Sequence, residues 1–285
     1  DATFDKVHKV GIMAGYSWEE RVNNDGFGLT VHNFFDDKLK WNQLSYAGTI
    51  DGMKGVESGT KETIRNISFY GRLSYSYDSR YMLQATIRRD GSSVFGDGHQ
   101  WGYFPSISGA WNITEEKFME GLKESLSLSN LKLRIGYGVS GNALGFGAYS
   151  AVATYGANGT IISIGGKDYP TLVSTKLANP DLKWEKTGML NIGLDYAFFN
   201  GRLNGSIEYY NKVTKDLIWN YPVTSFLYPF STISANVGEI TNRGIEISIN
   251  AIPVQNKNFT WTTTLNLSHN KNKVNKLTNE KFSTA

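Results

Sequence analysis

The stretch GRLSYSYDSRYMLQATIRRDGSS, residues 71 to 93, shows the pattern on which the fold prediction rests. Its apolar residues fall on alternate positions up to Tyr77, and the alternation resumes after Asp78-Ser79-Arg80. One face carries Leu73, Tyr75, Tyr77, Tyr81, Leu83, Ala85 and Ile87. The opposite face carries Arg72, Ser74, Ser76, Gln84, Thr86 and Arg88. A period of two over this length predicts two strands joined by a tight turn. Soluble sandwiches and membrane barrels both contain such hairpins, so the rest of the chain must decide between them.

The same alternation recurs in seven further segments of the chain. They cover residues 10–18, 103–113, 131–139, 190–198, 203–209, 245–249 and 259–267. The pair Asn200-Gly201, between two of these segments, is a typical type I′ turn sequence and predicts a second tight hairpin. Together with the two strands of the opening hairpin, the pattern predicts about nine strands.

The connections between the predicted strands alternate in length. Short breaks lie at 78–80, 199–201 and 254–258, and longer ones at 21–63, 141–182 and 220–236, with one of medium length at 90–100. Alternating short and long connections are typical of an up-and-down barrel whose two rims differ. One break on the short side, 114–130, is longer and has apolar residues at helical spacing, which predicts a short helix at that rim.

Aromatic residues flank the short turns. They are Tyr75, Tyr77, Tyr81, Tyr196, Phe198, Phe259 and Trp261. Aromatic strand ends with Leu, Ile and Ala between them indicate an interfacial girdle around a lipid-facing band. In a soluble sandwich, the large aromatics are expected in the middle of the strands. The predicted fold class is therefore all-β, an antiparallel up-and-down transmembrane β-barrel with the odd-numbered face of the opening hairpin towards lipid.

An open sheet of nine strands cannot span a bilayer by itself. Each orphan N–H or C=O group at its two edges would cost several kcal/mol in hydrocarbon. Bacterial single-chain barrels also have even numbers of strands. We therefore expect residues 1–285 to form part of a larger barrel; the alternative is that the strand count is wrong by one.

Composition excludes several classes of function. The 29 basic and 26 acidic residues give a net charge of only +3, which argues against a nucleic-acid partner. The absence of cysteine excludes disulfides and thiolate metal sites. The four histidines lie far apart, and no nucleophile, acid/base pair or metal triad has usable spacing. The sequence predicts neither an enzyme nor a bound cofactor.

Five segments carry a family resemblance. They are RRDGSSVFGDGHQWGYFPSISGAWNITEEKF (88–118), LKLRIGYGVSGN (131–142), NPDLKWEKT (179–187), YYNKVTKDLI (209–218) and NVGEITNRGIEISI (236–249). In this order, they resemble the SusC/RagA-type TonB-dependent outer-membrane transporters. Two positions depart from the pattern: Val94 stands where the family usually has a basic residue, and Arg243 where lysine is commoner.

The resemblance implies a barrel of about 22 strands, of which this chain would supply a part from the C-terminal half. It also implies an active importer of oligosaccharides or peptides in the outer membrane of a Gram-negative cell. The partners would be a SusD-like surface lipoprotein acting as a lid, and TonB, which would contact an N-terminal plug. No segment of residues 1–285 resembles a plug, so these parts are expected outside this chain.

Substrate contacts are expected from aromatic residues in the long connections, because aromatic rings stack on sugar faces. The candidates are Trp41, Tyr46, Trp101, Tyr149, Tyr155, Trp184, Trp219 and Tyr221. Arg88 is a further candidate, as a contact for an anionic group. The alternatives are a place in the outer girdle or in packing within folded loops for the aromatics, and a strand-end ion pair for Arg88. For the function, the alternatives are a siderophore-type receptor, a passive porin and a soluble β-rich binding module.

Overall fold

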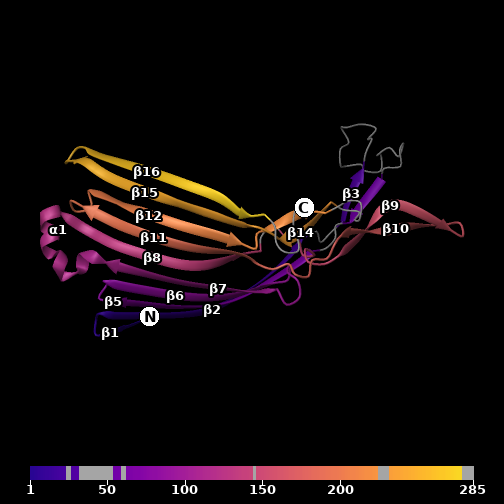
Figure 1. Ribbon diagram of the computed structural model, residues 1–285, viewed down its shortest axis with the longest axis horizontal. Helices are drawn as coiled ribbons and strands as arrows, with labels where there is room; N and C mark the ends of the chain where they lie inside the picture. Colours follow the sequence, from indigo (N-terminus) through magenta and orange to yellow (C-terminus); the bar gives the residue numbers. More distant parts are fainter. Residues whose placement is uncertain (24–26, 32–53, 59–61, 144–145, 224–230, 278–285) are drawn as a thin grey trace.

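The computed structural model describes residues 1–23, 27–31, 54–58, 62–143, 146–223 and 231–277. Its main element is a ten-stranded antiparallel sheet, in which strands that follow one another along the chain lie side by side apart from three small hairpins (Figure 1). The strands, in sheet order, are β1 (Ala2–Phe4), β2 (His8–Asn23), β5 (Glu62–Tyr77), β6 (Tyr81–Ser92), β7 (Trp101–Asn112), β8 (Leu128–Asn142), β11 (Glu185–Phe198), β12 (Leu203–Lys215), β15 (Glu239–Gln255) and β16 (Thr260–Lys276).

The nine predicted strands are confirmed as β2, β5 to β8, β11, β12, β15 and β16. The tenth, β1, was not predicted because its three residues are too few to show alternation. It pairs with β2 across a turn in which Asp5 and Lys6 have left-handed φ angles of 47° and 60°. Within the described residues, β1 and β16 are the two edges, and the sheet does not close on itself.

The two ends of the sheet differ as predicted. At the short-turn end, the hairpins turn through pairs of residues with left-handed φ angles, Asp78-Ser79 and Phe199-Asn200, as type I′ turns require. The second turn lies one residue before the predicted Asn200-Gly201, because the Gly201 N–H donates to the Phe198 carbonyl at 3.1 Å. The long connections meet at the opposite end and contain three small hairpins that the sequence did not predict (Figure 1). These are β3 (Phe27–Val31) with β4 (Lys54–Ser58), β9 (Thr154–Ile164) with β10 (Lys167–Lys176), and β13 (Ile218–Pro222) with β14 (Thr232–Asn236).

The predicted rim helix is present but shorter than its sequence segment. Two 3₁₀ turns, η2 (Ile113–Glu115) and η3 (Lys117–Met119), precede α1 (Glu120–Leu126). The Thr114 hydroxyl donates to Asn112 Oδ1 at 2.7 Å, and the Leu131 N–H donates to it at 3.4 Å. No helix of the described residues is long and apolar enough to cross a bilayer.

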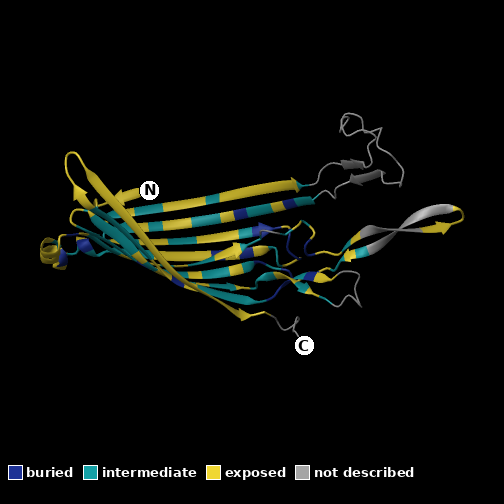
Figure 2. Ribbon diagram, turned by 90° about the horizontal axis from the view of Figure 1, so that it is seen from above, coloured by how far each residue is buried: buried dark blue, intermediate teal, exposed yellow. Residues whose placement is uncertain are grey.

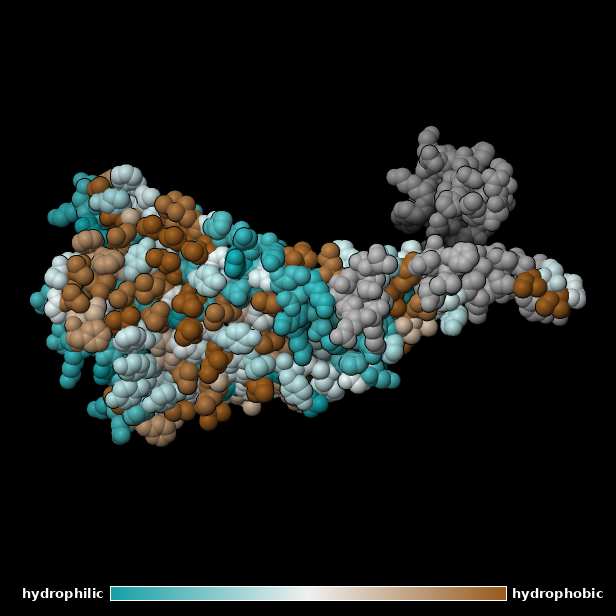
Figure 3. Space-filling view, in the orientation of Figure 1, coloured by the Kyte–Doolittle hydropathy of each residue, from teal (hydrophilic) through white to brown (hydrophobic). Residues whose placement is uncertain are grey.

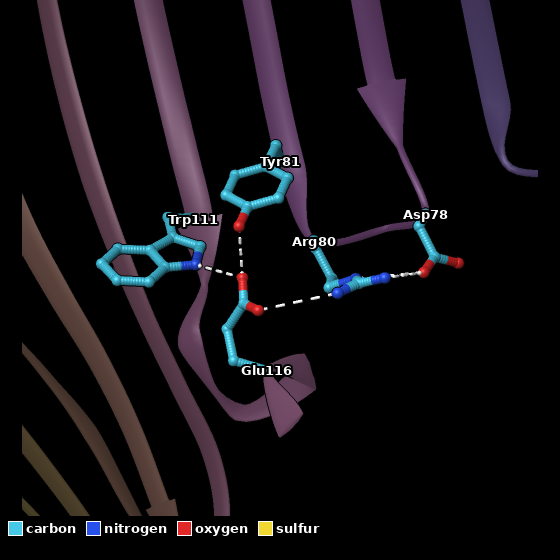
Figure 4. A network of polar contacts seen from close by, with 5 residues as sticks. All are labelled: Asp78, Arg80, Tyr81, Trp111 and Glu116. Atoms are coloured by element: carbon cyan, nitrogen blue, oxygen red, sulfur yellow. Dashed lines mark hydrogen bonds and ion pairs between the residues drawn. The ribbon is translucent and has the colours of Figure 1, made fainter. Parts of the chain in front are cut away.

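A polar network ties this rim to the aromatic girdle (Figure 4). The Glu116 carboxylate accepts hydrogen bonds from the Tyr81 hydroxyl and, at 3.0 Å, from Trp111 Nε1. Arg80 forms ion pairs with Glu116 at 3.6 Å and with Asp78 at 2.6 Å. The hydrogen bonds from Tyr81 and then Trp111 lower the pKa of Glu116. The rim is therefore held by a carboxylate whose charged form is stabilised.

The sheet has one apolar face and one polar face. Leu73 pairs with Ile12 on one side and Ala85 on the other, whereas its neighbour Arg72 pairs with Met13 and Thr86. Apolar side chains on the first face are about half exposed over most strands, and this apolar face is the one seen in Figure 3. A contiguous exposed apolar face of this kind marks contact with a membrane or a partner.

Buried residues gather at the end with the long connections (Figure 2). The cluster consists of Ile64, Val94, Phe95, Phe104, Ala151, Leu182 and Trp184. This cluster contains strand residues from the polar side of the sheet and residues from three separate connections. It therefore holds the connections against the sheet. Val94, a departure from the family pattern, is only 2% exposed in this core.

Candidate ligand-binding surface

Close packing in the core fixes the connection that follows β6. The Trp184 ring lies 4.9 Å from that of Phe95 and 5.3 Å from that of Phe104, between centroids, and its Nε1 donates to the Gln100 carbonyl at 2.9 Å. The Gly96 N–H donates to the Leu182 carbonyl at 3.1 Å. A Cβ atom on Gly96 would lie 1.9 Å from the Pro180 carbonyl oxygen, so only glycine fits here.

Two asparagines hold the β13–β14 hairpin against the same core. Asn179 donates from Nδ2 to the Ser234 carbonyl at 2.8 Å. Asn236 donates to the carbonyls of Lys183 and Asp216, both at 2.8 Å, and both asparagine residues are about nine-tenths buried. Each asparagine is the first residue of one of the segments that carry the family resemblance.

Between the fixed connections lies a hollow of about 690 Å³. It brings together two of the aromatic candidates: Tyr149, 40% exposed, and Tyr155 on β9, 69% exposed. Its wall consists of Glu62, Gly147, Tyr149, Ser150, Val152, Ala153, Thr154, Tyr155, Thr175 and Lys176. Two rings beside hydroxyl, carboxylate and ammonium groups form a surface that can stack on a ligand and hydrogen-bond to it.

The charged groups of the hollow were not predicted as site residues. The Lys176 ammonium donates to the Tyr149 carbonyl at 3.3 Å. Burial lowers the pKa of Lys176, and the nearby Glu62 carboxylate acts in the opposite direction. Glu62 begins β5 and Lys176 ends β10, and no local sequence pattern links two residues so far apart.

The other aromatic candidates lie in different surroundings. Trp219 on β13 is 63% exposed, and Tyr221 is half-buried two residues further on; neither lines the hollow. Trp101 lies on the apolar face, where it stacks on Phe69 at 6.4 Å between ring centroids. Trp184 is only 8% exposed, in the core, so the predicted ligand contact for this residue is replaced by packing. Trp41 and Tyr46 fall outside the described residues.

Arg88 forms an ion pair at its strand end. Its Nε lies 2.7 Å from Asp90 Oδ1, and its Nη2 donates to Ser68 Oγ at 2.9 Å. The guanidinium is therefore neutralised within the polar face, as the ion-pair alternative expected.

A second charged group lies further along the polar face. Arg134 binds both carboxylate oxygens of Asp195 at 2.8 Å and donates to Glu208 Oε1 at 2.7 Å. Gly193 leaves room for this guanidinium, because a Cβ there would lie 2.9 Å from Nη2. The described residues contain no group of three histidine or acidic side chains that could hold a metal ion.

Comparison with known proteins agrees with this architecture. Residues 4–283 match the family described as TonB dependent receptor-like, beta-barrel. TonB-dependent receptor P39 of Formosa agariphila is 38% identical over 98% of this chain and 25% of its own length. TonB-dependent receptor SusC of Bacteroides thetaiotaomicron is 35% identical over 95% of this chain and 24% of its own length. The chain thus spans about a quarter of the length of these relatives.

Solved structures show the same fold. The RagAB peptide importer in its closed-closed state superposes with a TM-score of 0.83 at 27% identity, over 98% of this chain and 29% of that chain. The siderophore receptor PirA from Pseudomonas aeruginosa reaches a TM-score of 0.55 at 14% identity over 95% of this chain and 41% of that chain, which shows a common fold alone. The SusC/RagA-type resemblance is confirmed, and the chain belongs to the β-barrel family of the TonB-dependent receptors.

Proposed function

We propose that this chain is part of an outer-membrane importer, not an enzyme, that takes up oligosaccharides or peptides with energy from TonB. A SusD-like lipoprotein would cover its outer opening. The relatives named TonB-dependent receptor and SusC support active import, and the RagAB peptide importer supports a peptide as one of the two ligand classes.

The two ends of the sheet give the orientation. Outer-membrane barrels have short periplasmic turns and longer extracellular loops. The end with the turns at Asp78-Ser79 and Phe199-Asn200 therefore faces the periplasm, and the end with the three small hairpins faces the cell exterior. The apolar face meets lipid, and the polar face lines the barrel interior.

The observation that carries the ligand assignment is the hollow at the outer end. Tyr149 and Tyr155 offer ring faces, while Glu62 and Lys176 offer one charge of each sign. Rings of this kind stack on sugars or on apolar peptide side chains, and the two charged groups suit hydroxyl groups or peptide termini. In this mechanism, the ligand binds here first, the lid then closes, and TonB displaces a plug supplied by the rest of the protein.

Binding to the full-length protein with its lipoprotein partner tests the assignment. Isothermal titration with defined oligosaccharides and peptides identifies the ligand class. The double variant Tyr149→Ala/Tyr155→Ala should then bind about tenfold more weakly, because two contact rings are lost. The control Tyr75→Ala/Tyr77→Ala removes two rings near the periplasmic turns and should bind as the wild type does. Equal affinity of the first variant and the wild type would contradict the assignment.

Uptake measurements separate the alternative functions. A passive porin would continue to admit the ligand in cells without TonB, whereas the proposed importer would not. A siderophore-type receptor would bind ferric chelates in preference to sugars or peptides. A soluble binding module would remain monodisperse without detergent.

A further inference from the structure

Five exposed cationic side chains lie together on the apolar face, near the outer ends of β11, β12, β15 and β16. They are Lys186, Lys215, Arg243, Lys271 and Lys273, which we call the outer basic patch. The strand register places them side by side. Lys186 pairs with Lys215, and Arg243 pairs with Lys271. Lys273 lies two residue pairs closer to the long connections than Lys271, in the row between these two pairs. Because adjacent strands are about 4.8 Å apart, these charges occupy one small area.

The patch borders the lipid-facing band directly. Arg243 and Lys271 lie in one row of paired residues across the strands. The next row on the same face, towards the periplasm, consists of Ile192, Tyr209, Ile245 and His269. The row after that is wholly apolar: Leu194, Ile207, Ile247 and Leu267. In Figure 3, hydrophilic residues likewise follow the apolar area in the direction of the long connections.

The height of the patch matches the outer boundary of the hydrocarbon. Lys271 lies ten residues after Trp261, which belongs to the aromatic girdle at the periplasmic end of the same strand. At about 3.4 Å per residue, this is about 34 Å along β16. A strand tilt of about 40° reduces it to about 26 Å, close to the apolar band of about 25 Å in outer-membrane barrels. The cations therefore lie at the level of the lipid headgroups.

On the other half of the sheet, cations of the apolar face have partners within the protein. Arg65 forms an ion pair with Glu20 at 2.7 Å. The Arg89 guanidinium lies 4.1 Å from the ring centroid of Trp101 and 5.5 Å from that of Tyr103. Cations on that half are thus neutralised or stacked within the protein itself.

In the outer basic patch, by contrast, no cation has an ion-pair partner among the described residues. The carboxylate of Glu239, opposite Lys215 in the register, accepts a hydrogen bond from Asn275 at 2.9 Å. Asp216 forms its ion pair with Lys183 at 3.0 Å. Glu239 is thus one carboxylate beside five cations, and the patch keeps a net positive charge.

A shallow groove of about 600 Å³ runs into the patch on the same face. Its lining consists of Tyr137, Val139, Gly188, Leu190, Asn211, Val213 and Thr241, with Lys186, Lys215, Asp216 and Glu239 at its outer end. Asp216 is the carboxylate already paired with Lys183. The apolar and small residues of the groove suit an acyl chain, and its outer end presents ammonium groups at headgroup level.

From this arrangement we infer that the outer basic patch binds the phosphate groups of a lipid headgroup in the outer leaflet, with an acyl chain of that lipid along the groove. The lysines and Arg243 supply charge-assisted hydrogen bonds to phosphate oxygens. This inference goes beyond ligand import and shares with it only the placement of the sheet in the outer membrane. Binding of this lipid would fix the orientation of the barrel in its bilayer.

The test uses the full-length protein purified from outer membranes. The variant Lys215→Gln/Arg243→Gln/Lys273→Gln removes three charges of the patch. The matched control Lys123→Gln/Lys132→Gln/Lys212→Gln removes three lysines from the rim helix and the polar face. Mass spectrometry measures how many lipid molecules remain bound per protein molecule after repeated detergent washes. We expect the patch variant to retain about tenfold less phosphorylated lipid than the wild type and the control.

Two further arms identify the ligand and exclude misfolding. Thermal unfolding in detergent is followed with the native phosphorylated lipid, the same lipid after dephosphorylation, and inorganic phosphate alone. Stabilisation of the wild type by the phosphorylated lipid only supports the inference. Equal stabilisation by the dephosphorylated lipid or by inorganic phosphate would overturn it, as would full lipid retention by the patch variant. An unchanged unfolding temperature of that variant without lipid shows that its barrel is folded.

Discussion

Asn236 and Lys183 exchange two hydrogen bonds, one in each direction. The Lys183 N–H donates to Asn236 Oδ1 at 2.9 Å, and Asn236 Nδ2 donates to the Lys183 carbonyl at 2.8 Å. The Asn236 side chain thus makes the two hydrogen bonds to the Lys183 backbone that a neighbouring strand would otherwise make. A third hydrogen bond, to the Asp216 carbonyl at 2.8 Å, joins the two ends of the β13–β14 hairpin. One side chain therefore fixes the outer hairpin relative to the barrel.

Replacing this side chain should loosen the hairpin. In Asn236→Ala, three backbone groups lose their partner at a buried position, which should cost about 2–4 kcal/mol of stability. The matched control is Asn220→Ala, an exposed asparagine on the same hairpin, with an effect within about 0.5 kcal/mol. Hydrogen exchange of the Lys183 and Val237 amides measures the difference. Unchanged protection of both amides in Asn236→Ala would contradict this role.

The outer core should be sensitive to loss of volume. Leu182 has no exposed surface, and Leu182→Ala should reduce the free energy of unfolding by about 2–5 kcal/mol. Leu133→Ala on the apolar face, where the side chain is 37% exposed, should have a smaller effect. Thermal unfolding of the full-length protein in detergent compares the two. Similar losses in both variants would show that the cluster around Leu182 is not the core of this region.

Gly96 should tolerate no side chain. In Gly96→Ala, the new Cβ would meet the Pro180 carbonyl oxygen, so the two connections must separate and the Gly96–Leu182 hydrogen bond weakens. Gly121→Ala is the control, because nothing lies near its Cβ and alanine favours a helix by about 1 kcal/mol. We expect a lower unfolding temperature for the first variant and an equal or higher one for the second. Equal stability of Gly96→Ala and the wild type would contradict the close contact between Gly96 and the Pro180 carbonyl.

The rim network should weaken in acid. The pKa of Glu116 is lowered in the folded protein by its hydrogen bonds from Tyr81 and Trp111, so its contribution is fully present above the ordinary value of 4.5. This contribution is lost as pH falls through the lowered pKa. Hydrogen exchange over residues 113–126, corrected for its intrinsic pH dependence, should show protection falling below about pH 4.5 in the wild type.

The control for this pH dependence is Glu116→Gln, which removes the titrating group. Its rim segment should be less protected than the wild type at neutral pH, because the ion pair with Arg80 is lost. Its protection should then change less with pH in the acid range. An identical acid response in the two proteins would show that Glu116 is not the group responsible.

The strands and their faces could be predicted from local sequence patterns. Alternation at Leu73, Tyr75 and Tyr77 fixes which side chains share a face, because successive residues of a strand point to opposite sides. Tight turns are also local, since they depend on the φ angles of two residues, so the turn after Phe198 was predicted to within one residue. For these reasons, nine of the ten strands of the sheet and the difference between its rims could be predicted.

Which residues of the candidate surface lie together depends on the folded chain. Trp184 and Tyr155 look alike in the sequence, yet one is buried against Phe95 and Phe104 while the other lines the hollow. Glu62 and Lys176, like the five cations of the outer basic patch, come together through strand register and loop packing. These contacts join distant parts of the chain, so their geometry depends on how all the strands align, which no local pattern records.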